Sequence, residues 1–367
     1  MKVLVTGTAG FIGSHVTLNL LERGDEVIVP PEPTSPTAER TACECSHKTR
    51  ERMAPDIRAA YRSMRGGEIC ELVHGQLRVA DPMKQFLRQL RDQPWVLNPL
   101  VALLGLARRI GILRGERIYR HVPYRGMVRV AMTGGYSFRV ISRGGQIENG
   151  LYWEGLRAHE PGSMAIWVRA ASTARVVLDI GANSGLFTLA AAAAGAREVH
   201  AFEPVPRVYA ILAANLAANN FPLVRAWQSA VADRPGIADM YDPGGETPTS
   251  ASLSNDFSRE HFGNIPSFKV PVVSVDGFCS EHRINHIDLI KLDVEGHEEF
   301  ALRGMCEAVL RNRPAILMEV LGGYEDRLRE VVVELFGDSY SWTRIHESDG
   351  GPDRNVLLVS EKTFPTT

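Results

Sequence analysis

Hydrophobic residues follow two different spacings in the second half of the chain. Residues 176–180 form a short apolar, β-branched run with the length of a buried parallel strand. Residues 186–194 are almost entirely helix-forming and end at Gly195. A second short apolar run follows at residues 199–202. A strand, a helix and another strand in this order predict one βαβ half of a doubly wound α/β sheet.

The alternation of strands and helices continues toward the C-terminus and then changes. Residues 240–262 are polar and contain several serines, so we expect a flexible lid or a substrate loop there. The pattern predicts further strands at 223–229, 270–275, 287–292 and 314–320, and helices at 209–220 and 324–335. Two last apolar runs, joined by a turn rich in Gly and Asp, predict a terminal antiparallel hairpin over 340–346 and 355–359.

The turn after the first predicted strand has an unusual charge for a nucleotide-binding turn. Its pattern is D-x-G-A-N-x-G, with Asp179 two residues before the first glycine. A carboxylate there would repel a pyrophosphate but suits a ligand with an amino group or a sulfonium. S-adenosylmethionine has both, and its ribose suits Glu203 at the end of the second strand. We therefore expect the cofactor S-adenosyl-L-methionine to bind at Asp179 and Glu203, with Gly181 and Gly185 letting it approach the backbone closely.

Residues 230–233 follow the third predicted strand, where the adenine of such a cofactor would lie. Asp233 could accept a hydrogen bond from the adenine amino group, and we include it among the cofactor-binding residues. It could equally be a turn residue, because Arg234-Pro235-Gly236 follows.

A second cluster of polar residues follows the predicted strand at 287–292. Asp293, Glu295 and His297 alternate, so they could converge if the segment is extended. Asp293 falls at the carboxyl end of its strand, where open parallel sheets bind ligands. We expect a catalytic role for the three residues, such as taking a hydroxyl proton. They could also ligate a divalent metal, an interpretation that we do not favour, or simply begin a helix.

Composition limits the other partners. The 367-residue chain has a formal net charge of −2, which provides no global argument for nucleic acid or an anionic membrane as a partner. Its five cysteines, an odd number, indicate a reducing compartment, and we expect a cytoplasmic protein. No secretory signal and no run of membrane-spanning length is evident. The oligomeric state stays open.

The N-terminus contains a separate βαβ opening. The pattern predicts strands at 2–6 and 26–29, a helix at 11–23 and a G-x-x-G-x-x-G turn at residues 7–13. These residues resemble the start of the extended short-chain dehydrogenases, which include the nucleotide-sugar epimerases and dehydratases. Pro30 and Pro31 stand where that family carries a ribose-binding acid, and no Tyr is followed four residues later by Lys. We interpret residues 1–29 as a truncated dinucleotide-fold fragment.

Two further segments separate this fragment from the first core strand. Residues 30–126 combine a Pro-rich linker with stretches of helical composition, including residues 51–91. Residues 127–174 contain strand-like runs and an aromatic, acidic stretch, and we expect a lead-in segment there. The catalytic domain is then expected over residues 175–362.

Three stretches carry a resemblance to a known family. They are Leu178-Asp-Ile-Gly-Ala-Asn-Ser-Gly185, Phe202-Glu-Pro204 and Ile287-Asp-Leu-Ile-Lys-Leu-Asp-Val-Glu-Gly-His-Glu298. From about residue 148 to 360, the chain resembles the FkbM family of S-adenosylmethionine-dependent methyltransferases. The resemblance implies a class I methyltransferase fold: a seven-stranded, Rossmann-like doubly wound sheet with a terminal antiparallel hairpin. It also implies that Asp179, Gly181, Asn183, Gly185 and Glu203 bind the cofactor and that residues 293–297 face the acceptor.

The acceptor implied by this resemblance is a hydroxyl group, often on a sugar or a polyketide. The chain lacks the D/N-P-P-Y/F/W motif of amino-group methylases that act on nucleic acids, which also favours an oxygen acceptor. We therefore expect a small-molecule or glycan hydroxyl as the partner and no nucleic acid. Two alternatives are an NAD-dependent epimerase-like protein, argued from residues 1–29, and a non-catalytic module that binds the cofactor.

Overall fold

The computed structural model describes eight stretches of the chain: residues 2–4, 26–28, 70–73, 76–79, 94–109, 122–244, 250–347 and 354–360. The chain divides into two compact units, residues 1–100 and 101–367. Among the described ranges, no helix is both long and apolar enough to cross a membrane.

The first unit contains two small strand pairs. Strands β1 (Lys2–Leu4) and β2 (Glu26–Ile28) pair in parallel and fall within the two predicted strands. Strands β3 (Cys70–Val73) and β4 (Gln76–Val79) form an antiparallel pair, so the expected helical character of residues 51–91 is wrong for these eight positions. Their β-branched valines favour a strand over a helix. The predicted helix at 11–23 and its glycine turn lie outside the described residues.

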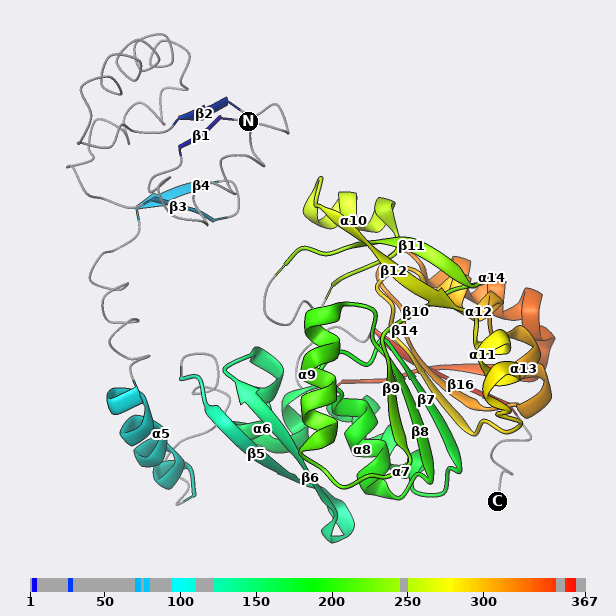
Figure 1. Ribbon diagram of the computed structural model, residues 1–367, viewed down its shortest axis with the longest axis horizontal. Helices are drawn as coiled ribbons and strands as arrows, with labels where there is room; N and C mark the ends of the chain where they lie inside the picture. The colour runs from blue at the N-terminus through cyan, green and yellow to red at the C-terminus, as the bar shows by residue number, and fades with distance from the viewer. Residues whose placement is uncertain are drawn as a thin grey trace. The chain divides into compact units, whose positions relative to one another are not determined.

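The second unit is built on a seven-stranded sheet (Figure 1). The strand order is β15-β16-β14-β13-β7-β8-β9, and β16 runs antiparallel to both of its neighbours. This arrangement confirms the Rossmann-like class I sheet and the terminal hairpin. The strands are β7 (Val176–Ile180), β8 (Glu198–Phe202), β9 (Val224–Trp227), β13 (Leu289–Leu292), β14 (Ala315–Glu319), β15 (Tyr340–Arg344) and β16 (Asn355–Ser360).

Helices cover both faces of this sheet because its strands are apolar on both sides (Figure 1). One apolar cluster packs α7 and α8 on one face, and another packs α11 to α14 on the opposite face. Helix α5 (Pro94–Arg109) crosses the boundary between the two units along the chain. The other helices of the described ranges are α6 (Gln146–Glu154), α7 (Pro161–Ala171), α8 (Leu186–Ala194), α9 (Pro206–Ala217), α10 (Asn255–Phe262), α11 (Val275–His282), α12 (Glu298–Arg303), α13 (Cys306–Asn312) and α14 (Glu325–Phe336). Short 3₁₀ turns are η2 (Thr133–Gly135), η3 (Gly155–Ala158) and η4 (Gly337–Ser339).

The segment before β7 shares the hydrophobic core of the sheet. The hairpin of β5 (Arg125–Ala131) and β6 (Ser137–Arg143) and helices α6 and α7 contribute to the same cluster as β7 and α8. Trp167 of α7 is fully buried, and its indole N–H donates to the carbonyl oxygen of Phe187 at 2.9 Å. The lead-in is therefore continuous with the sheet in its packing.

The start of α7 is held by a residue from far along the chain. The carboxylate of Glu347 accepts hydrogen bonds from the backbone N–H groups of Gly162, at 2.7 Å, and Ser163, at 3.1 Å. The Ser163 hydroxyl donates to the same carboxylate. A carboxylate at this position satisfies the free N–H groups of the first helical turn and interacts favourably with the helix dipole.

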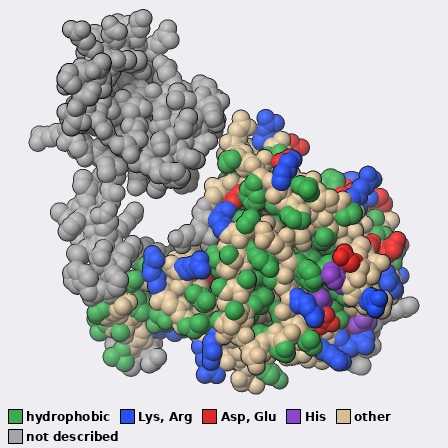
Figure 2. Space-filling view, in the orientation of Figure 1, with side chains coloured by type: hydrophobic (Ala, Val, Ile, Leu, Met, Phe, Trp, Pro, Cys, Tyr) green, Lys and Arg blue, Asp and Glu red, His purple; other side chains and the backbone are tan. Residues whose placement is uncertain are grey.

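A smaller sheet lies beside the main one. It contains β10 (Ala230–Val231), β12 (Ser267–Val273) and β11 (Gly236–Tyr241), in that order. The region expected to be a flexible loop, residues 240–262, instead contains the end of β11 and helix α10. Ser254 is the N-cap of this helix. Its hydroxyl oxygen accepts a hydrogen bond from the N–H of Phe257 at 3.1 Å, a capping arrangement that favours a helix. On the face shown in Figure 2, Lys and Arg side chains are interspersed with acidic and apolar ones.

Candidate active site

The turn between β7 and α8 brings two distant parts of the chain into contact. Gly181 has φ of +83°, and its N–H donates to the carbonyl oxygen of Phe202 at 3.0 Å. A Cβ atom at this position would lie 1.7 Å from the carbonyl oxygen of Asp293. Only glycine fits both the backbone conformation and this contact. Gly185, with φ of +91°, precedes α8, and a Cβ there would collide with Leu212.

Glu203 lies at the end of β8 and faces the same turn. Its side chain accepts backbone N–H groups from Asn183, at 3.0 Å, and Val205, at 2.9 Å. Burial raises the pKa of Glu203 to about 7, although both hydrogen bonds lower it. Each carboxylate oxygen has a second lone pair. The arrangement therefore fits a ligand with two neighbouring hydroxyl groups.

Asp179 is fully buried at the end of β7. Its Oδ2 accepts the Thr188 hydroxyl at 2.5 Å, whereas its Oδ1 is buried without a hydrogen-bond partner among the described residues. Burial raises the pKa of Asp179, and the nearby Lys291 lowers it. A buried carboxylate oxygen without a partner is costly, so this atom is suited to a cationic ligand group.

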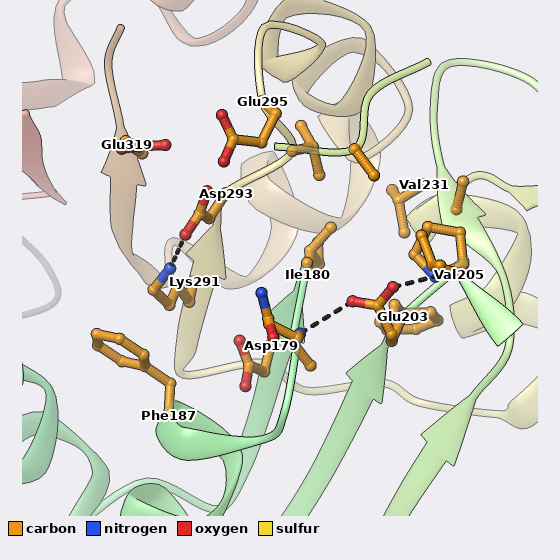
Figure 3. A pocket seen from close by; sticks show the side chains of 18 of the residues that line it. Asp179, Ile180, Phe187, Glu203, Val205, Val231, Lys291, Asp293, Glu295 and Glu319 are labelled. Carbon is orange, nitrogen blue, oxygen red and sulfur yellow. Dashed lines mark hydrogen bonds and ion pairs between the residues drawn. The ribbon is translucent and has the colours of Figure 1, made fainter. Parts of the chain in front are cut away.

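A cavity of about 280 Å³ joins these residues to the end of β13. It opens at the carboxyl ends of the parallel strands, as in other doubly wound sheets. Its polar lining includes Asp179, Asn183, Glu203, His159, Glu160, Lys291, Asp293, Glu295, His297 and Glu319. Figure 3 shows Glu203 on one side and the group of Asp293, Glu295 and Glu319 on the other.

Lys291 and Asp293 form an ion pair at the end of β13. Lys291 is 3% exposed, and its Nζ donates to Oδ2 of Asp293 at 2.5 Å (Figure 3). Burial alone would lower the pKa of Lys291, but the charges of Asp293, Glu160 and Asp179 raise it above its ordinary value. Burial would raise the pKa of Asp293, but Lys291 holds it below its ordinary value. Both groups are therefore charged at neutral pH.

Two further carboxyl groups lie beside Asp293. One oxygen each of Asp293, Glu295 and Glu319 lie within 4.8 Å of one another. Burial and the charge of Asp293 raise the pKa of Glu295 to about 9 and that of Glu319 to about 10. Carboxyl groups this close cannot all be ionised beside a single cation. The cluster therefore combines one carboxylate with two neutral carboxylic acids at neutral pH.

His297 lies at the cavity but outside this cluster. Glu295 has φ of +53° and Gly296 has φ of +83°, so the chain turns here and the expected extended segment is wrong. A positive φ at a non-glycine residue is not visible in a polar–polar alternation. His297 instead precedes α12 and stacks on Phe300 at 4.5 Å between ring centroids. Burial lowers its pKa to about 4, so it is neutral at physiological pH.

Asp233 lies outside the cavity. It pairs with Arg234 at 3.5 Å, has a side chain that is 37% exposed, and borders a separate shallow hollow. The cavity wall at this strand end is formed by Ser229, Ala230 and Val231. The structure therefore places other residues of this stretch nearer the cavity than Asp233. The contact of Asp233 with the adenine stays a prediction.

Lys291 and Glu319 received no role from the sequence. A lysine within an otherwise apolar, buried strand is the signal that marks Lys291, because lysine is almost never buried without a partner. Glu319 ends β14, the strand beside β13. Its proximity to Asp293 depends on that strand order, which the sequence pattern alone does not determine.

Comparison with protein families separates the two parts of the chain. Residues 179–345 match the model of the methyltransferase FkbM domain. Residues 3–98 match the NAD dependent epimerase/dehydratase family, so this likeness extends well beyond the 29 residues predicted. A 29-residue stretch is 62% identical to UDP-glucose 4-epimerases of Erwinia amylovora and Klebsiella pneumoniae. The stretch is 8% of this chain, and it spans only 9% and 21% of those two relatives.

Solved structures with a similar fold include methyltransferases of different kinds. Methyltransferase FkbM from Methylobacillus flagellatus KT is 14% identical, with 97% of this chain and 89% of that chain covered and a TM-score of 0.38. The T. thermophilus 16S rRNA N2 G1207 methyltransferase, solved with AdoMet and guanosine, is 16% identical, with coverages of 65% and 51% and a TM-score of 0.36. Over residues 179–345, the chain carries a domain of the FkbM methyltransferase family, and an epimerase-family segment precedes it.

Proposed function

We propose that the second unit transfers a methyl group from S-adenosyl-L-methionine to a hydroxyl group of a sugar, a glycan or a secondary metabolite. One observation carries the proposal: a single cavity joins the buried acids Asp179 and Glu203 to an ionised carboxylate, Asp293. The first two acids suit the cofactor, and the third suits an acceptor that must lose a proton.

The residues at the first end of the cavity fit the cofactor. Glu203 would hold the two ribose hydroxyls, because both of its oxygens are oriented by backbone N–H groups. The Oδ1 atom of Asp179, which has no hydrogen-bond partner among the described residues, would accept a hydrogen bond from the amino group of the cofactor. Asn183 would contribute to the wall of the site, and Gly181 and Gly185 would allow the turn. When bound, the cofactor supplies the activated methyl group, and the protein supplies alignment.

The other end of the cavity fits a hydroxyl acceptor. A hydroxyl has a high pKa, so a positioned base accelerates the reaction. Asp293 is ionised and has 24% of its side chain exposed, which leaves it accessible from the cavity. Glu295 and Glu319, as neutral acids, can each donate and accept hydrogen bonds. Several such groups around one base favour an acceptor with more than one hydroxyl, such as a sugar.

A second candidate function follows from the family match of residues 3–98, which favours a nicotinamide cofactor. The chain has no Tyr followed four residues later by Lys, the catalytic pair of that family. A non-catalytic module that binds S-adenosylmethionine is less well supported, because Lys291 and Asp293 place a buried ion pair at the acceptor end. We further propose a cytoplasmic location, since the five cysteines suit a reducing compartment.

Calorimetric titration separates these candidates. The full chain is titrated with S-adenosylhomocysteine, and with NAD and NADH in parallel. We expect binding of the first compound. Binding of a nicotinamide cofactor alone would contradict the proposal. Labelled methyl transfer is then screened on monosaccharides, nucleotide sugars, hydroxylated small molecules and RNA, with and without EDTA. Transfer to RNA alone would contradict the hydroxylated small-molecule acceptor.

Substitution of Asp293 tests its role. We expect Asp293→Asn to lower kcat by about 10²-fold or more, because the base is lost, while the affinity for S-adenosylhomocysteine stays within about threefold. Asp338→Asn is the control, since Asp338 is exposed on η4. If Asp293→Asn abolished cofactor binding without a separate loss of turnover, Asp293 would belong to the cofactor site instead.

A further inference from the structure

Lys291 places a single positive charge between the two ends of the cavity. Strands β7 and β13 are paired so that Lys291 of β13 lies opposite Asp179 of β7. Asp293 follows Lys291 by two residues, directly after the end of β13. The ammonium group donates to Asp293 at 2.5 Å, and the ring centroid of Phe187 lies 4.5 Å away on another side. A cation with 3% exposure is stable only because these carboxylates compensate its lost hydration.

The carboxyl cluster has the spacing of a cation site, and Lys291 already provides a cation. Oxygens of Asp293, Glu295 and Glu319 lie within 4.8 Å of one another, close enough to surround one metal ion. The ammonium group, however, contacts Asp293 directly. Burial and the charge of Asp293 raise the pKa of Glu319 to about 10, so this neighbour of Asp293 is a neutral acid that adds no charge. One ammonium ion therefore balances the one carboxylate of the cluster.

We propose that Lys291 is a positioning residue whose buried ammonium group takes the place of a metal ion in this cluster and keeps Asp293 ready to accept the proton of the acceptor hydroxyl. The inference rests on the proposed function. As the acceptor oxygen bonds to the methyl carbon, the carbon–sulfur bond breaks and its electron pair stays on sulfur, leaving a neutral thioether. The hydroxyl proton passes to Asp293. Lys291 itself neither gains nor loses a proton.

Binding of Mn²⁺, measured by the loss of its free-ion EPR signal at about pH 8, tests this role without an acceptor. Lys291→Met removes the charge and keeps an unbranched side chain. Lys291→Arg keeps the charge. The control is Lys269→Met, which removes a lysine that pairs with Asp239 at 2.8 Å on the surface. Circular dichroism shows whether each variant is folded, and Lys291→Gln replaces Lys291→Met if that variant is not.

We expect the wild type, Lys291→Arg and Lys269→Met to bind Mn²⁺ weakly. Lys291→Met should bind one Mn²⁺ at least about tenfold more tightly, and adding Glu319→Gln should remove the gain. Two results would overturn the proposal: tight Mn²⁺ binding by the wild type that Glu319→Gln abolishes, or no gain in Lys291→Met. Failure of the wild type to bind S-adenosylhomocysteine would instead contradict the proposed function, since the Mn²⁺ measurement does not depend on the cofactor.

Discussion

At the scale of single residues, the cavity shows how surroundings assign different states to one chemical group. Glu203, Asp293 and Glu319 are all carboxyl groups that line the same space. Asp293 is ionised because Lys291 contacts it, whereas burial keeps Glu319 neutral with a pKa of about 10. The pKa of Glu203, about 7, lies between those of Asp293 and Glu319. Of these three groups, Glu203 is therefore the one whose ionisation changes near physiological pH.

Cofactor affinity should depend on the charge of Glu203. The folded protein raises its pKa from 4.5 to about 7, so the side chain becomes neutral as the pH falls below that value. Hydrogen bonds to a charged group contribute about 1.5–3 kcal/mol and neutral ones about 0.5–1.5 kcal/mol, so an ionised carboxylate accepts ribose hydroxyls more strongly. Calorimetry should therefore show weaker binding of S-adenosylhomocysteine at about pH 6 than at about pH 8.5.

A matched pair of variants isolates this effect. Glu203→Gln should weaken binding by about tenfold or more at the higher pH and should remove the pH dependence. Glu281→Gln, at an exposed position of α11, should change neither. An affinity of the wild type that is constant across this pH range would show that Glu203 does not hold the ribose as an anion.

Removal of the Lys291 charge should move the pH dependence of turnover. Burial would raise the pKa of Asp293 if the ammonium group did not lower it. The acidic limb of kcat should therefore shift to higher pH in Lys291→Met and stay near its original position in Lys291→Arg. If kcat falls in Lys291→Met but the acidic limb of its pH profile does not move, the role of Lys291 is in packing and not in the charge of Asp293. The other ionisable groups near Asp293 are His159, Glu160, Asp179, Glu295, Glu298, Glu319 and Arg354.

Part of this site is predictable from residue types and spacing. The sequence places Asp179 and Asp293 at strand ends, and the structure has both lining one cavity. The roles of Lys291 and Glu319 depend on register between β7, β13 and β14. Contacts across strands that are far apart in the sequence do not appear in any local pattern, so the position of Glu319 beside Asp293 is not predictable. Lys291 is marked only as a lysine within an apolar strand, which does not show that it lies opposite Asp179.

At the scale of elements, the turn after β7 and the end of β13 are fitted to each other. Gly181→Ala would place a methyl group 1.7 Å from the Asp293 carbonyl oxygen and would also force an L-residue to φ of +83°. The left-handed conformation alone costs about 1–2 kcal/mol. We expect Gly181→Ala to lower the free energy of unfolding by at least about 2 kcal/mol in urea, or to prevent folding.

Gly322→Ala provides the control for this prediction. A Cβ atom at Gly322 would meet nothing within 4 Å, and the residue has no positive φ. Its free energy of unfolding should change by less than about 0.5 kcal/mol. Equal effects of the two substitutions would show that the contact between the turn and β13 is not a constraint on the fold.

The predicted elements were most accurate where apolar runs are long and continuous. Strands β7, β8, β13 and β14 fall within or beside their expected ranges because four or five buried residues follow one another. Helix α10 was missed because its composition is polar and its first turn depends on the cap at Ser254. Local capping can therefore produce a helix where hydrophobic periodicity gives little signal.

At the scale of the whole molecule, the catalytic domain is predicted to start at residue 175. The side chains that the preceding segment buries allow this boundary to be tested. The lead-in buries Val130, Phe138, Trp153, Met164 and Trp167. A buried large apolar side chain contributes about 1.5–3 kcal/mol, so losing all five would remove an amount comparable with a total stability of about 5–15 kcal/mol. We expect residues 175–367 alone to be unfolded by circular dichroism and to bind no S-adenosylhomocysteine.

A longer fragment serves as the matched comparison. Residues 122–367 retain the whole lead-in, and residues 101–367 form a compact unit by themselves. We expect this fragment to melt cooperatively and to bind S-adenosylhomocysteine within about threefold of the full chain. A fragment of residues 175–367 that folds and binds equally well would support a domain that starts at residue 175.

The hydrogen bond from Ser163 to Glu347 has a consequence for biosynthesis. Its two residues are 184 positions apart, so the ribosome makes the start of α7 long before it makes the group that caps it. Strand β16, which lies between β14 and β15, is translated later still. Contacts this distant form slowly and leave apolar surface exposed in the meantime. The nascent sheet must therefore persist without its final strand, and chaperones have their longest opportunity to bind during that interval.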